Sequence, residues 1–287
     1  MNTQTIPSQQ GARSARAGAL WVALGAALTF VFLKAPFLVA EQAVGSKFRD
    51  RPGLVSSLRK SFKMYWASGE TAFPHELATV VRFWLIYHTT KAVVAGLLLV
   101  VLTVLTVALF KSLINARDSA FLRRLVLATS GVVAAAMALL SLLVTMANIQ
   151  GAIAPFASLL PMLDEPGGQP ADADTVAEVK RGLTELVASG GQESAPLRVM
   201  VSDFGSYHVA MAVVAAFVAV ALAAATIALW RSAMRSSPVE ARRRRLMVIL
   251  GAAIVPVALG MVIITLANAG TATDPAPALL AFFEGGW

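Results

Sequence analysis

Residues 87–112 read YHTTKAVVAGLLLVVLTVLTVALFKS, and residues 207–232 read YHVAMAVVAAFVAVALAAATIALWRS. Both stretches begin with Tyr-His and end with a basic residue followed by Ser, at a spacing of 120 residues. The agreement continues downstream, where TMAN at 145–148 returns as TLAN at 265–268. Chance supplies isolated apolar identities in such a chain, but it does not supply polar landmarks in one register. We therefore predict an internal duplication.

The composition indicates a membrane protein. The chain has 287 residues, of which 57% are hydrophobic and 14% are charged, and its mean hydropathy is +0.70. This apolar content exceeds what one core of that size can hide from water. Four runs without a charged residue are long enough to cross about 30 Å of hydrocarbon. They are 92–110, 125–147, 209–230 and 246–267, and a shorter fifth run covers 17–33.

The distribution of charge predicts the orientation in the membrane. The short segments 111–124 and 231–245 have net charges of +3 and +5, whereas 148–208 and 268–287 have net charges of −5 and −2. The positive-inside rule then places the N-terminus in the cytoplasm and the C-terminus outside, in a bacterial inner membrane. Segment 34–91 falls outside despite nine basic and four acidic residues. The opposite orientation would export four consecutive arginines.

The predicted fold is an all-α integral membrane protein with five transmembrane helices. One leading helix precedes two parallel copies of a unit made of an amphipathic outer helix and a transmembrane hairpin. For the leading helix, a cleaved signal peptide is the alternative. The expected parts are a disordered cytoplasmic tail 1–16; the first transmembrane helix 17–40; copy one, 54–160, with outer helix 54–68 and spans 88–110 and 124–148; an acidic linker 161–174; copy two, 175–280, with outer helix 175–189 and spans 208–230 and 245–268; and an external tail 281–287.

The two outer helices carry opposite charge around similar apolar stripes. Leu54, Leu58 and Phe62 recur at helical spacing in the first, and Thr175 with Glu178 forms a capping-box pattern in the second. The first outer segment is net positive and the second is net negative. We expect the two helices to associate, directly or through a shared partner, as an outer platform.

His88 and His208 are the candidate cofactor ligands, because the duplication would place them at equal depth. Two imidazoles are enough to ligate a haem iron, whereas they form an incomplete site for a divalent metal. An interfacial belt of aromatic side chains is the structural alternative. No cofactor is therefore predicted, and haem is kept as an alternative. The chain has no cysteine, which excludes thiolate ligands and thiol catalysis.

Further polar residues would surround the histidines at the outer helix ends. Asn148 and Asn268 are expected to cap their helices. The complete predicted polar outer cluster is Tyr87, Lys91, Asn148, Gln150, Tyr207 and Asn268. On the cytoplasmic side we expect arginines to meet anionic headgroups and to fix topology. These are Arg123, Arg124, Arg242, Arg243, Arg244 and Arg245.

The sequence lacks the motifs of common enzymes, and its four long apolar runs contain no ionisable side chain. The expected function is therefore a non-enzymatic scaffold or accessory subunit of a membrane complex, bound to a protein partner or to its own copies through the extracytoplasmic face. Nucleic acid is not an expected partner. The alternatives are a transporter or carrier of an apolar or lipid substrate, and a haem- or metal-binding redox subunit that uses the two histidines.

Overall fold

The computed structural model describes residues 8–45, 48, 50–115, 121–164, 170–190, 193–237 and 240–286. Helices make up 91% of the structure, and the described residues contain no strand. In chain order the helical elements are α1 (Ser8–Val44), α2 (Arg51–Ser68), α3 (His75–Asn115), α4 (Phe121–Ile153), the 3₁₀-helix η1 (Ala157–Leu163), α5 (Pro170–Ser189), α6 (Ala195–Met234), α7 (Ala241–Thr273) and α8 (Pro275–Phe283).

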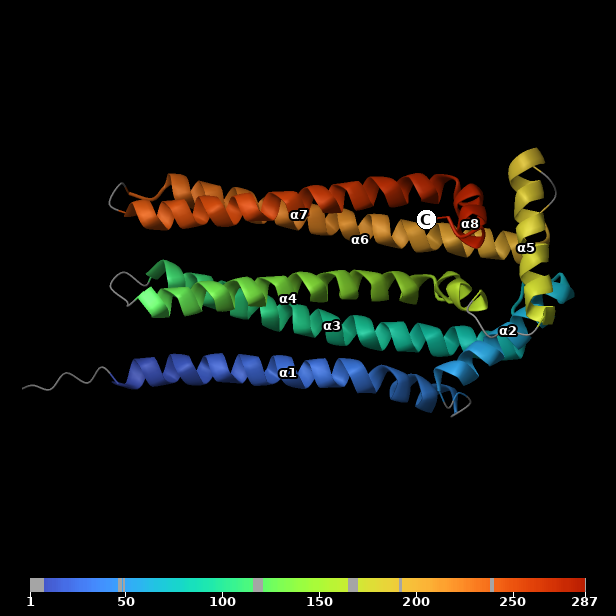
Figure 1. Cartoon of the computed structure of the whole chain (residues 1–287), viewed down its shortest axis with the longest axis horizontal. Coiled ribbons are helices and arrows are strands. Elements are labelled where there is room, and N and C mark those ends of the chain that lie inside the picture. The colour runs from blue at the N-terminus through green and yellow to red at the C-terminus, as the bar shows by residue number, and fades with distance from the viewer. Residues whose placement is uncertain are drawn as a thin grey trace, which may run out of the picture.

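Five long helices run side by side along the molecule (Figure 1). Each is long and apolar enough to cross a membrane, which confirms the predicted number of spans. The apolar segments are Gly18–Val44 in α1, together with the whole of α3, α4, α6 and α7. Only 11% to 22% of the most apolar window of each span is buried within the protein. Because Phe217 exposes 74% of its surface and Ile263 exposes 67%, this surface requires lipid, and the chain is a multi-pass membrane protein.

Four shorter helices gather at one end of the long helices, and we call α2, η1, α5 and α8 the short-helix layer (Figure 1). Local signals bound α2 and α5. The carboxylate of Asp50 accepts a hydrogen bond of 2.8 Å from the amide of Gly53 and caps the start of α2. Gly69 ends α2 with φ 67°, and Gly190 follows α5 with φ 61°. Both glycines thus adopt the left-handed conformation that ends a helix.

The largest hydrophobic core of the described chain lies in this layer. Its members come from the short-helix layer and from the adjoining turns of α1, α3 and α6. Tyr65, Phe62, Phe156, Leu183 and Phe283 are among the large side chains that expose less than 2% of their surface. Helices α2 and α5 contribute to the same core, and Trp66 on α2 donates a hydrogen bond of 2.9 Å to Glu178 on α5.

Several helices extend beyond the sequence-based expectation. Helix α1 begins at Ser8 within the expected tail 1–16, and α5 begins at Pro170 within the expected linker 161–174. Two further differences have the same physical reason. Helix α3 starts at His75 and not near residue 88, because its first turns bury Leu77 and Val80 in the core of the layer. Helix α8 also includes residues 281–283 of the segment expected as an external tail. Helix α8 runs to Phe283, whose ring exposes 1% of its surface, because this ring belongs to the same core.

The long helices pair as hairpins. Helix α3 pairs with α4, α6 pairs with α7, and α1 packs on α3. Helices α3 and α6 both begin beside the short-helix layer, and α4 and α7 both return to it (Figure 1). The hairpins contact each other mainly through α4 and α6. A small cluster of buried residues marks this contact: Met146, Ala215, Ala219 and Met261.

Candidate functional site

His88 of α3 faces Asn148 of α4 near the short-helix end of the first hairpin. The Nδ1 atom of His88 lies 2.9 Å from the Oδ1 atom of Asn148. The amide nitrogen of Asn148 donates to the carbonyl oxygen of Val144 at 2.7 Å, which leaves Oδ1 as the acceptor. The imidazole therefore donates from Nδ1, and its Nε2 atom is an acceptor. This Nε2 atom is buried and has no hydrogen-bond partner among the described residues.

The second hairpin contains the corresponding contact. The Nδ1 atom of His208 on α6 lies 2.8 Å from the Oδ1 atom of Asn268 on α7. The amide nitrogen of Asn268 donates to the carbonyl oxygen of Ile264 at 2.8 Å. In each hairpin the histidine and asparagine are 60 residues apart in sequence. In each hairpin the histidine on one helix is therefore hydrogen-bonded to the asparagine on the other helix.

The asparagines do not end their helices, which corrects the capping expectation. Helix α4 continues beyond Asn148 to Ile153, and α7 continues beyond Asn268 to Thr273. Each asparagine amide instead donates to the carbonyl four residues earlier in its own helix, and each side-chain oxygen meets a histidine. The asparagines therefore connect the two helices of each hairpin.

Aromatic rings surround the first histidine closely. The rings of Trp84 and Tyr87 stack with centroids 4.9 Å apart and an angle of 8° between their planes, and Trp84 meets the His88 ring edge-on at 4.8 Å. On the α4 side Gly151 approaches the imidazole. A Cβ atom at Gly151 would lie 2.8 Å from the Nδ1 and Cε1 atoms of His88, closer than van der Waals contact permits. This approach explains why glycine occupies the position.

Lys91 lies one turn further along α3 and faces α1. Its ammonium nitrogen is 4.8 Å from the centroid of the Phe32 ring and 5.1 Å from that of the Tyr87 ring. It also donates a long hydrogen bond of 3.4 Å to the Tyr87 hydroxyl. Two aromatic faces and a hydroxyl thus receive this cation at the contact between the leading helix and the first hairpin.

Gln150 connects the two hairpins, because its amide nitrogen donates to the carbonyl oxygen of Tyr207 on α6 at 3.1 Å. Its side chain exposes 5% of its surface. The residues of the predicted polar outer cluster consequently form four separate contacts and not one site. Two are the histidine–asparagine contacts within the hairpins, the third is the contact of Lys91 with Tyr87, and the fourth is the Gln150 bond between the hairpins.

Sequence reasoning missed Asp203. Its carboxylate accepts a hydrogen bond of 2.7 Å from the backbone amide of Ala157, at the start of η1. This bond fastens the segment after α4 to α6, which lies in the second hairpin. A signal was present in the sequence, since Asp203 is the only Asp, Glu, Lys or Arg between residues 199 and 230.

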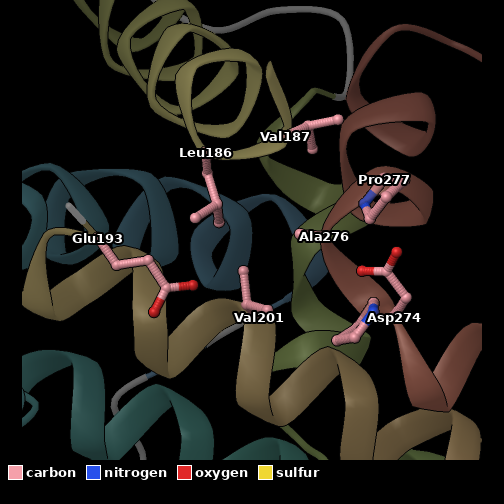
Figure 2. A pocket seen from close by; sticks show the side chains of 8 residues that line it. Leu186, Val187, Glu193, Val201, Asp274, Ala276 and Pro277 are labelled. Carbon is pink, nitrogen blue, oxygen red and sulfur yellow. The ribbon is translucent and has the colours of Figure 1, made fainter. Parts of the chain in front are cut away.

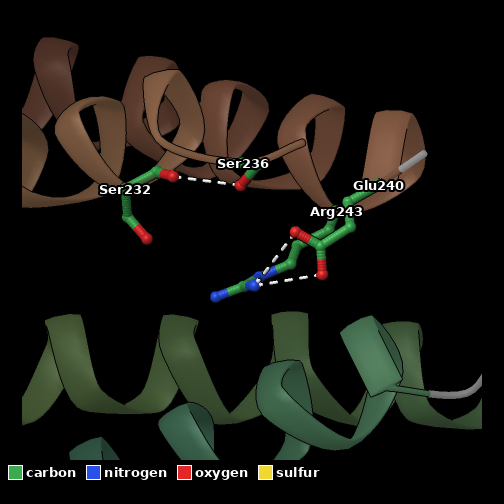
Figure 3. Close-up of polar contacts among 4 residues, drawn as sticks. All are labelled: Ser232, Ser236, Glu240 and Arg243. Carbon is green, nitrogen blue, oxygen red and sulfur yellow. Dashed lines mark hydrogen bonds and ion pairs between the residues drawn. The ribbon is translucent and has the colours of Figure 1, made fainter. Parts of the chain in front are cut away.

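The predicted topology arginines lie at the opposite end of the long helices from the short-helix layer. Arg242 donates to the carbonyl oxygen of Leu113 on α3 at 3.4 Å, so one arginine connects the two hairpins at this end. Arg243 forms an ion pair of 3.3 Å with Glu240 one turn earlier (Figure 3). Arg123, Arg244 and Arg245 are exposed, whereas Arg124 is half-buried.

The chemistry available at these positions is limited. Within the residues that the structure describes, no three side chains of His, Cys, Asp or Glu come together as a metal site. His88 and His208 are each hydrogen-bonded through Nδ1 to their own hairpin. Comparison of the chain with models of protein families, with curated proteins and with solved structures found no match in any of the three. A proposal about function therefore depends on the arrangement of the molecule itself.

Proposed function

We propose that this protein is a non-enzymatic scaffold or accessory subunit of a membrane complex, which presents the short-helix layer to a partner outside the cytoplasm. The observation that carries the proposal is the unequal packing of the molecule. The short-helix layer holds the largest hydrophobic core, whereas the five spans bury little of their own surface. A rigid, well-packed layer at one end of a lipid-exposed bundle suits the binding of another protein.

The exposed charges of the layer support a protein partner. Lys60 and Lys63 are exposed on α2, whereas α5 exposes Asp174, Glu178 and Glu185 together with one basic residue, Arg181. The apolar sides of both helices are committed to the shared core. Their outer sides therefore offer a basic and an acidic surface next to each other, which would orient a partner of mixed charge or a second copy of this chain.

We propose an orientation of the protein in the membrane as well. The arginine-rich end would lie in the cytoplasm of a bacterial inner membrane and contact anionic headgroups, and the short-helix layer would lie outside. Because the natural chain has no cysteine, labelling of a single introduced cysteine shows on which side of the membrane that residue lies. Ala188→Cys on α5 should react with a membrane-impermeant maleimide in intact spheroplasts, and Ser237→Cys should react only after permeabilisation. The reverse pattern would overturn this orientation.

We also propose that the two hairpins are copies produced by an internal duplication. It is supported by the two histidine–asparagine contacts at equal sequence separation and by the common direction of α3 and α6. A second pair of contacts agrees with it. Gly131 lies under the Phe110 ring in the first hairpin, and Gly251 lies under the Trp230 ring in the second. The two hairpins would then be copies with matching interiors and different outer charges.

The test of the scaffold is co-purification from native membranes in mild detergent. A protein in constant proportion should accompany the wild type, and Lys60→Glu with Lys63→Glu should release it while thermal unfolding remains unchanged. The matched control is Lys111→Glu, which alters an exposed lysine at the other end of the molecule. A wild-type protein that purifies without any protein in constant proportion, and that does not self-associate, would contradict the proposal.

A carrier of an apolar or lipid substrate is a second candidate, favoured by the contact between the hairpins. Within the spans this contact has only a small buried core of methionine and alanine side chains. Such a contact can separate at low cost and admit a lipid from the side. Lipid extraction followed by mass spectrometry of the purified protein tests this candidate. One lipid class that is retained in constant proportion and is enriched over the membrane would support it.

A further inference from the structure

A cavity of about 320 Å³ opens at the edge of the short-helix layer. It lies where α5 meets the start of α6 and the junction between α7 and α8 (Figure 2). Its volume falls at the lower end of the range found for small-molecule sites, about 300–1,000 Å³. Its lining includes Leu186, Val187, Glu193, Val201, Asp274 and Pro277.

Two carboxylates occupy opposite walls of this cavity, with aliphatic side chains between them (Figure 2). Glu193 is half-buried just before α6, and Asp274 is exposed just before α8. Neither side chain has a hydrogen bond or an ion pair to any other part of the described chain. Both carboxylates are therefore available to a ligand.

The local sequence limits the capping hydrogen bonds that the carboxylate of Asp274 can accept. Asp274 occupies the N-cap position of α8, where an aspartate normally accepts a hydrogen bond from the amide two or three residues later. Pro277, three residues later, has no amide hydrogen, which leaves the amide of Ala276 as the only donor of this kind. No capping hydrogen bond forms from the side chain of Asp274. Its carboxylate faces the cavity instead (Figure 2).

We propose that this cavity binds an aliphatic diamine or polyamine. Two separated anions with an apolar surface between them match a ligand that has two ammonium groups joined by methylene groups. A compact divalent ion fits this arrangement less well, because calcium requires six to eight oxygen ligands around one point. Leu186, Val187 and Val201 provide the apolar contact for the methylene chain. The cavity occupies one edge of the short-helix layer, so binding of a diamine there does not require the proposed protein partner.

The test is isothermal titration calorimetry on the purified full-length protein in detergent, with three probes of equal chain length. Hexamethylenediamine should bind most tightly, hexylamine about two- to five-fold more weakly, and hexanol more weakly again, because each exposed ion pair contributes a modest share. Raising the salt concentration from about 0.05 M to about 0.5 M should weaken the diamine and leave hexanol unchanged. Equal affinities for the diamine and hexanol would overturn the proposal.

Variants assign the carboxylates individually. Glu193→Gln and Asp274→Asn should each weaken the binding of hexamethylenediamine about two- to five-fold and reduce its advantage over hexylamine. Glu76→Gln, an exposed position at the start of α3 outside the cavity lining, is the matched control and should bind as the wild type does. Wild-type affinity in both cavity variants, or no binding of the diamine to the unmodified protein, refutes the site. The probe series on the unmodified protein decides the question even where a variant misfolds.

Discussion

Replacing Gly151 with alanine should destabilise the protein through a single contact. The added Cβ atom would lie 2.8 Å from the His88 ring, so the imidazole must move away from Asn148. Crowding of a packed interior costs about 1–3 kcal/mol, and a weakened hydrogen bond adds about 1 kcal/mol. The better helix propensity of alanine offsets up to about 1 kcal/mol. The expected net loss in the free energy of unfolding is therefore about 1–3 kcal/mol.

The assay is equilibrium unfolding in mixed detergent micelles, with Gly260→Ala as the matched control. Gly260 lies in α7, and a Cβ atom there would meet no atom within 4 Å. The control variant should be as stable as the wild type or slightly more stable. In a His88→Ala background the alanine at position 151 should cost nothing, because the ring it would meet is gone. Equal stability of Gly151→Ala and Gly260→Ala in the wild-type background would refute the reasoning.

Three further predictions concern the short-helix layer. Burial raises the pKa of Tyr65 to about 12 from 10.0, so the folded state favours the neutral phenol and loses stability as the pH rises from 10. Tyr65→Phe should remove this loss of stability at alkaline pH, which is about 1–3 kcal/mol. Equilibrium unfolding at pH 9 and at pH 11 measures the difference. Trp66→Phe should cost about 0.5–1.5 kcal/mol by deleting the bond to Glu178, and a double-mutant cycle with Glu178→Ala measures the coupling, which would be zero if the bond is unimportant. Asp203→Ala should cost about 1–3 kcal/mol by leaving the amide of Ala157 without its acceptor, whereas Asp203→Asn should retain most of the stability in the same assay.

The sequence predicts the number of spans correctly but not the lengths of the helices. The spans were expected where charge is absent, so Arg82 and Arg198 excluded the first turns of α3 and α6 from them. Those turns are helical because Leu77 and Leu197 pack into the core of the short-helix layer. Hydropathy measures transfer into lipid. It does not register a helix that leaves the membrane and continues into a core made of protein.

The contacts of the candidate site could also be predicted only in part from the sequence. The duplicated landmarks direct attention to His88 and Asn148 within their hairpin, but a helix-ending asparagine was the simpler interpretation of the sequence. Only the rotation of α4 about its axis brings the Asn148 oxygen to the imidazole. The contact of Asp203 with Ala157 depends in turn on how η1 folds back against α6. Neither the rotation of α4 about its axis nor the folding of η1 against α6 can be recognised from a periodic pattern or a motif in the sequence.

The sequence by itself determined that the chain is helical, that five of its helices are apolar enough to cross a membrane, and that the short turns between paired spans have a net positive charge. These properties follow from the composition of continuous segments. The tertiary structure alone decided that α2, η1, α5 and α8 share one core, and that Glu193 and Asp274 face a common cavity. The physical reason is that these contacts join residues distant in the chain, and packing sets their geometry.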